Sequence, residues 1–195
     1  MVSAETKEPV SGAAPRRRAR IAGIFYLLTF LTGAFAAFVS GKLVLYREAF
    51  SLAATACYVV VTVLFYGLFK VVDETLSLIA VLFSLVGCAI SAANLFHLLA
   101  YPIKAINPLV LFGVYCLLIG YLIFRSTFLP RILGLLMSFG GLSWLTFISQ
   151  DLAISLSPYN FAPGMLGEGA LTVWLLVFGL NAERWERQAG AAGKL

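Results

Sequence analysis

The chain places a few ionisable and polar side chains inside otherwise apolar stretches, and these are the points where chemistry could occur. One of them is Glu168, in the stretch SPYNFAPGMLGEGALTVWLLVFG from Ser157 to Gly179. An ionisable group within a membrane-spanning segment costs about 2.5–3.5 kcal/mol on insertion scales, so such groups are usually paired or functional. Glu168 is therefore the first candidate for a functional side chain.

Two further polar groupings accompany Glu168. At helical pitch, Ser91, Asn94, His97 and Tyr101 form one polar stripe on a helix that is otherwise apolar. A second grouping, Ser149 to Asp151, closes a later apolar stretch. If these groupings lie on the same side of a membrane as Glu168, they predict one outward-opening polar pocket. The predicted ligand-binding residues are Asn94, His97, Tyr101, Gln150, Asp151 and Glu168.

Each of these residues also has a purely structural explanation. Glu168 can lie in the first turn of a helix, where the helix dipole stabilises an anion by about 0.3–1 kcal/mol. Asp151 can end a helix at the water interface, and His97 can be a neutral, solvated imidazole. Asn94 can form a hydrogen bond between helices. The residue types alone leave the structural and the functional interpretations open.

The sequence gives little support for metal, redox or hydrolytic chemistry. Its three cysteines, Cys57, Cys88 and Cys116, lie inside apolar runs without the spacing of a metal pair, and an odd number does not suggest a disulfide framework. Such cysteines behave as small apolar residues. With His97 as its one histidine, the chain cannot ligate haem through two imidazoles, and it has no HExxH or GxSxG motif. We predict no metal site, leave the cofactor unknown, and favour a protein that is not an enzyme.

The composition indicates a membrane protein. Of the 195 residues, 61% are hydrophobic and 12% are charged, whereas a soluble domain is about 45–50% apolar and about 25% charged. The net charge of +5 comes from basic residues that flank apolar runs, and not from a basic folded face of the kind that binds nucleic acid. We therefore expect no nucleic-acid partner.

Six apolar runs are long enough to cross a bilayer as helices. The predicted fold is all-α, a bundle of six transmembrane helices over residues 21–182. Residues 1–20 are predicted to be a disordered basic tail, and residues 183–195 a C-terminal tail. The predicted spans are 21–40, 49–69, 76–100, 108–125, 131–153 and 165–182.

The distribution of basic residues predicts the orientation, because cytoplasmic flanks are enriched in Lys and Arg. With six spans, one side carries Lys42, Arg47 and Lys104. The other side, which includes both termini, carries Lys7, Arg16, Arg17, Arg18, Arg20, Lys70, Arg125, Arg131, Arg184, Arg187 and Lys194. Both termini are therefore predicted to be cytoplasmic, and Glu168 lies toward the outer side. Arg125 and Arg131 are predicted to anchor the protein to lipid head groups, and Trp185 to lie at the membrane interface.

Several segments resemble a known family. RIAGIFYLLTFLTGAFA (20–36), IGYLIFRSTFLPRILGLLMSFGGLSWL (119–145) and GEGALTVWLLVFG (167–179) are similar to the bacterial membrane family named domain of unknown function 4386. FRSTFLPRILG (124–134) is the most specific part, followed by the Gly167–Glu168 pair and Trp174. The resemblance implies a bacterial inner-membrane protein with several helical spans, and it implies no activity.

The sequence leaves several functions in competition. The first is a sensor or accessory subunit that binds a small amphiphilic molecule or lipid in the outer-side pocket. The alternative is a small proton-coupled transporter or permeation protein that acts as an oligomer. An intramembrane enzyme has the least support, and a purely structural role fits the small-residue packing equally well. Membrane lipids are the expected partners, with a homo-oligomer or a partner membrane protein left open.

Overall fold

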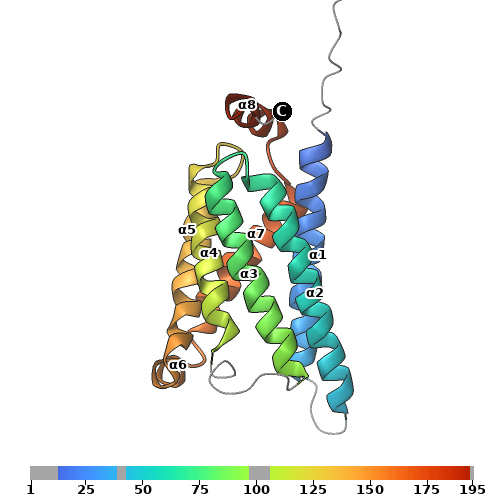
Figure 1. The fold of residues 1–195 in the computed structure, drawn as a ribbon, viewed down its shortest axis with the longest axis vertical. Helices are drawn as coiled ribbons and strands as arrows, with labels where there is room; N and C mark the ends of the chain where they lie inside the picture. The colour runs from blue at the N-terminus through green and yellow to red at the C-terminus, as the bar shows by residue number, and fades with distance from the viewer. Residues whose placement is uncertain (1–12, 39–42, 97–105, 194–195) are drawn as a thin grey trace, which may run out of the picture.

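The computed structural model describes residues 13–38, 43–96 and 106–193, and all regular structure in those residues is helical (Figure 1). This confirms the all-α fold. The elements are α1 (Ala13–Phe38), α2 (Val44–Phe69), α3 (Glu74–Leu95), α4 (Pro108–Arg125), α5 (Arg131–Leu145), the 3-10 turn η3 (Thr146–Ile148), α6 (Gln150–Leu156), α7 (Phe161–Val177) and α8 (Ala182–Ala191).

Long apolar helices dominate this fold. Helices α1 to α4, and α5 together with η3, are long and apolar enough to cross a membrane, and α7 with α8 forms a further pair bent by 104°. The described residues therefore hold five or six candidate transmembrane helices, in agreement with the predicted class. At a rise of 1.5 Å per residue, the 17 residues of α7 span about 25 Å.

The long helices form a closed ring. Each packs against its neighbour in chain order from α1 to α5, α7 packs against α5, and α7 also packs against α1. In Figure 1 the start of α1 and α8 lie at one end of the bundle, and α6 lies at the other. We call the first the arginine end, because Arg16, Arg125, Arg131 and Arg184 lie there, and the second the α6 end.

Helices α4 and α5 approach each other closely because glycines line their contact. A Cβ atom at Gly120 would lie 2.7 Å from the carbonyl oxygen of Gly134, and one at Gly141 would lie 2.7 Å from that of Gly113. Small residues at such spacings let membrane helices approach until their backbones touch. The predicted packing role of Gly134 is confirmed.

Several predicted boundaries were wrong. Residues 13–20 are helical, because Ala and Arg favour helix and Pro15 fits a first turn. The predicted fifth span, 131–153, ends with η3 at Ile148, and the cap at Ser149 then redirects the chain into α6. The predicted sixth span, 165–182, runs from Phe161 to Val177. The predicted C-terminal tail contains α8.

Helix α8 covers the arginine end of the bundle. It buries Trp185 and Ala189, and the indole N–H of Trp185 donates to the carbonyl oxygen of Leu68 at 2.9 Å. The prediction of Trp185 as an interfacial anchor was therefore wrong. A buried indole N–H needs an acceptor, and the end of α2 supplies it.

Candidate functional site

Glu168 lies in the middle of α7, inside the ring of helices. Its residue is 7% exposed, and α7 begins at Phe161, two turns before it. The interpretation of Glu168 as a first-turn residue was therefore wrong. Pro163 made the preceding segment read as a loop, but proline is tolerated in the first turn of a helix, where its missing N–H has no partner to lose.

Three other helices supply hydrogen bonds to the Glu168 carboxyl group. The Tyr26 hydroxyl of α1 donates to Oε2 at 2.7 Å. The Trp144 indole of α5 donates to Oε1 at 2.8 Å, and the Cys116 thiol of α4 donates to the same oxygen at 3.7 Å. A buried carboxyl needs such partners, and these residues tie α1, α4, α5 and α7 together at one point.

The donors restrict where a proton can lie on this carboxyl. An indole N–H can only donate, so Oε1 is an acceptor in every protonation state that keeps the bond from Trp144. A protonated Glu168 would carry its proton on Oε2, with Tyr26 as the acceptor. None of the ion pairs found in the described residues involves Glu168. Hydrogen-bond donors, and not a neighbouring cation, hold this group.

Two glycines of α7 make the arrangement possible. A Cβ atom at Gly164 would collide with the Trp144 indole, and one at Gly167 would collide with the carbonyl oxygen of Leu136. Helix α7 can therefore approach α5 closely enough for Glu168 to reach Trp144. This gives a physical reason for the Gly167–Glu168 pair.

Glu168 lies at the inner end of a cavity of about 470 Å³. The lining residues come from all six helices of the ring, and apart from Tyr58, just past the middle of α2, they lie in the half of each helix nearest the α6 end. Most of them are small or apolar. They are Thr29, Phe30, Gly33, Ala34, Ala37, Ala54, Thr55, Tyr58, Cys88, Ser91, Leu109, Phe112, Trp144, Phe161, Met165 and Glu168.

Two buried tyrosines beside this carboxyl have hydroxyl groups without partners. Tyr58 and Tyr115 are 7% and 0% exposed, and neither hydroxyl forms a hydrogen bond of ordinary geometry with the described residues. Their rings pack edge to face, with centroids 5.8 Å apart. Tyr58 lies close to Glu168 and lines the cavity. A buried unpaired hydroxyl costs free energy unless something satisfies it.

Sequence reasoning missed Tyr26, Tyr58, Tyr115, Cys116 and Trp144. A signal for the three tyrosines exists in the sequence. Each lies near the middle of an apolar run, away from the interfaces where tyrosine is usually enriched in membrane proteins. A tyrosine hydroxyl in the middle of a membrane needs a hydrogen-bond partner. Three such tyrosines therefore indicate a buried acceptor among the helices.

Among the described residues, no hydrogen bond joins Glu168 to Asn94, Gln150 or Asp151. Asn94 is half-buried on α3, with its Oδ1 unpaired. Gln150 and Asp151 are exposed on α6, and Gln150 lines a separate hollow of about 570 Å³ beside Asn107. His97 and Tyr101 lie outside the described residues. A role for these five residues in ligand binding stays a prediction.

The predicted lipid anchors lie at the arginine end. Arg125 is exposed, forms an ion pair with Asp73 at 3.8 Å, and lies over the Tyr121 ring. Arg131 is exposed and lies over the Phe124 ring at 5.5 Å. Both remain accessible, and lipid anchoring by them stays a prediction. Among the described residues, no group of three or more His, Cys, Asp and Glu side chains could hold a metal ion.

The fold and the site define a helical membrane-type protein with a carboxyl group inside its bundle. Residues 103–179 match the family described as Domain of unknown function (DUF4386). This match confirms the resemblance to that family, and it covers Cys116, Trp144 and Glu168. Searches among curated proteins and solved structures found no match.

Proposed function

We propose that this protein binds a small amphiphilic molecule in the central cavity, with the polar head of the ligand at Glu168 and Tyr58. The observation that carries the proposal is the Tyr58 hydroxyl, which lies in the cavity wall close to the Glu168 carboxyl and makes no well-formed hydrogen bond with the described residues. A ligand that bonded to Tyr58 would satisfy a group that the described part of the protein leaves unsatisfied. The protein would act as a sensor or an accessory subunit.

The cavity lining indicates the chemistry of the ligand. Small and aromatic side chains, among them Gly33, Ala34 and Phe112, surround space suited to a hydrocarbon or ring system. At the inner end, Tyr26, Trp144 and Cys116 donate to the Glu168 carboxyl, and the Tyr58 hydroxyl lies close to it. The head group should therefore accept a hydrogen bond from Tyr58.

The opposite half of the bundle favours binding over permeation. Between Glu168 and the arginine end, large side chains fill the interior, and Phe65, Leu122 and Leu175 are each at most 1% exposed. The buried polar side chains of that half include the hydroxyls of Thr62, Ser77, Ser84 and Thr172, but among the described residues no buried charged side chain lies there. The proton-coupled transporter is therefore the weaker proposal.

The membrane and the orientation are part of the same proposal. Basic residues gather at the arginine end, where α1 begins and α8 lies (Figure 1). Under the positive-inside rule that end faces the cytoplasm, and the cavity then lies toward the outer side. The family resemblance favours the plasma membrane of a bacterium.

Mass spectrometry of small molecules extracted from the purified protein tests the binding proposal. Gly33 is suited to the comparison, because a Cβ atom there meets nothing within 4 Å and a larger side chain extends into the cavity. We expect a co-purifying amphiphile in the wild type and its loss in Gly33→Phe. The control is Ala53→Phe, a substitution of similar size on the exposed face of α2. Equal retention in both variants, or no small molecule in the wild type, would refute the proposal.

A further inference from the structure

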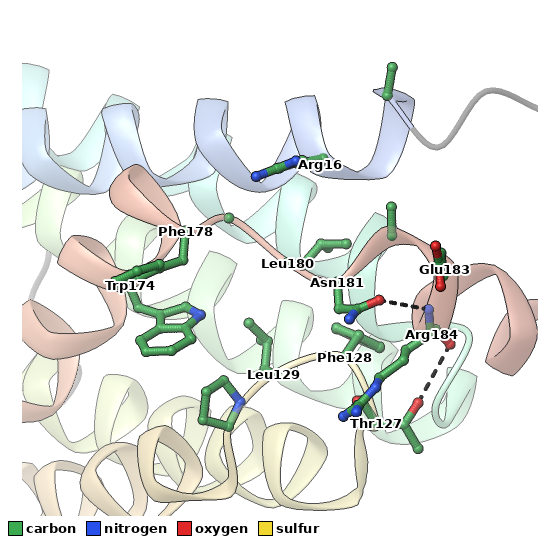
Figure 2. A pocket seen from close by; sticks show the side chains of 14 residues that line it. Arg16, Thr127, Phe128, Leu129, Trp174, Phe178, Leu180, Asn181, Glu183 and Arg184 are labelled. Atoms are coloured by element: carbon green, nitrogen blue, oxygen red, sulfur yellow. Dashed lines mark hydrogen bonds between the residues drawn. The ribbon is translucent and has the colours of Figure 1, made fainter.

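A further hollow lies at the arginine end, remote from the central cavity. It has a volume of about 920 Å³ and lies between the start of α1, the turn from α4 to α5, the end of α7 and the start of α8 (Figure 2). We call it the arginine groove. Its residues are Ala13, Arg16, Thr127, Phe128, Leu129, Pro130, Trp174, Phe178, Gly179, Leu180, Asn181, Ala182, Glu183 and Arg184.

We propose that the arginine groove binds the head group of an anionic phospholipid. Figure 2 shows Arg16 on α1 and Arg184 on α8, at two edges of the groove. Both are exposed, and Arg16 has no hydrogen bond or ion pair with the described residues. Arg184 makes a long bond of 3.4 Å to the carbonyl oxygen of Thr127. A guanidinium group can bind phosphate through two parallel hydrogen bonds.

The one acid in the groove does not cancel this charge. Glu183 lies on the first turn of α8, and its carboxylate pairs with Arg187 at 3.3 Å. Arg20, one turn further along α1 on the same face as Arg16, is also exposed. The local charge is therefore positive, as an anionic head group requires.

An apolar furrow continues from the groove along the outer face of the bundle and provides a place for an acyl chain. The furrow has a volume of about 450 Å³ and shares Trp174 and Phe178 with the groove. A Cβ atom at Gly169 would meet nothing within 4 Å, so the furrow is open there. Its residues are Leu133, Met165, Leu166, Gly169, Ala170, Val173, Trp174 and Phe178.

The continuity of groove and furrow selects a lipid over a soluble phosphate. A soluble anion would use the two arginines alone and would leave the furrow empty. A phospholipid places its phosphate between Arg16 and Arg184 and lays one chain along α7. Basic clusters at the end of transmembrane helices bind anionic lipids in this way.

Contacts between α8 and the bundle hold the groove in shape. The Thr127 backbone N–H donates to Oε1 of Gln188 at 3.1 Å, and the Asn181 backbone N–H donates to the carbonyl oxygen of Phe128 at 3.2 Å. These bonds fix the turn Ser126–Pro130 against α8. They also give a structural role to the FRSTFLPRILG stretch, whose turn forms one wall of the groove.

Native mass spectrometry in detergent, with phosphatidylglycerol and phosphatidylcholine added at equal concentration, tests this proposal. We expect the wild type to retain phosphatidylglycerol preferentially. The double variant Arg16→Gln/Arg184→Gln should lower that retention by about fivefold for each arginine removed. The double variant Arg17→Gln/Arg18→Gln removes the same charge from other faces of α1, outside the groove, and should change retention little.

Two further measurements distinguish a bound phospholipid from a soluble anion. Gly169→Leu should lower phosphatidylglycerol retention with all arginines in place, and this variant also serves if the arginine double variant does not fold. Soluble glycerol phosphate should not compete at concentrations comparable with the lipid. Equal retention of the two lipids, equal loss in both arginine double variants, or effective competition by glycerol phosphate would overturn the proposal.

Discussion

The indole N–H of Trp144 donates to Oε1 of Glu168 at 2.8 Å and joins the last turn of α5 to the middle of α7. The indole packs directly on the backbone of Gly164. The same side chain thus sets the spacing of the two helices and positions the carboxyl at the end of the cavity. Stability and ligand binding should therefore depend on overlapping residues.

Substitution of Trp144 by Phe should destabilise the protein by about 1–3 kcal/mol, because Oε1 of the buried Glu168 loses its strongest donor. Thermal unfolding in detergent measures the effect. Trp174→Phe is the control, since this half-buried indole makes no hydrogen bond with the described residues. Equal melting temperatures for the two variants would contradict the hydrogen bond from Trp144 to Glu168.

Tyr26 and Tyr115 provide a matched pair of hydroxyl deletions, since both are 0% exposed. Tyr26→Phe should cost about 1–3 kcal/mol, because its hydroxyl donates to Glu168. Tyr115→Phe should be neutral or stabilising, because it removes a buried hydroxyl without a partner. Unfolding by denaturant titration distinguishes the two, and a larger loss at Tyr115 would show that its hydroxyl is in fact bonded.

The glycine contact between α4 and α5 should not tolerate a methyl group. Gly120→Ala places a Cβ atom 2.7 Å from the carbonyl oxygen of Gly134, so the helices must separate, at a cost of about 1–3 kcal/mol. Gly33→Ala, with open space around its Cβ atom, should be neutral or stabilise the protein by up to about 1 kcal/mol through helix propensity. The melting temperature of Gly120→Ala should therefore fall below that of the wild type. The melting temperature of Gly33→Ala should stay the same or rise.

Labelling of single introduced cysteines tests the proposed orientation. Tyr159 is 82% exposed at the α6 end, and Arg187 is exposed at the arginine end with a side chain 77% accessible. In intact cells, a membrane-impermeant maleimide should label Tyr159→Cys and should label Arg187→Cys only after permeabilisation. The native Cys88 and Cys116 are buried but Cys57 is only half-buried, so the labelling is compared in a Cys57→Ala background. The reverse pattern would place the cavity on the cytoplasmic side.

The arrangement of spans could be predicted because hydropathy and flanking charge are local properties of the sequence. The all-helical class, the α2 end at Phe69 and α4 over residues 108–125 all follow from runs of apolar residues between charged turns. Glu168 was also identified correctly as an unusual residue. Its cost in a membrane is a property of the residue itself.

The partners of Glu168 could not be predicted, because they lie far away in the sequence. Tyr26 is separated from Glu168 by 142 residues and Cys116 by 52, and no periodicity shows which faces of distant helices meet. The start of α7 was placed too late because Pro163 suggested a loop. That error made Glu168 a first-turn residue.

A density map of the protein purified from its native membrane tests the central claim most directly. We expect the Glu168 carboxyl to bond to Tyr26 and Trp144, with non-protein density in the cavity within reach of the Tyr58 hydroxyl. A map in which side chains fill the cavity, or in which Glu168 points toward surrounding lipid, would contradict the account.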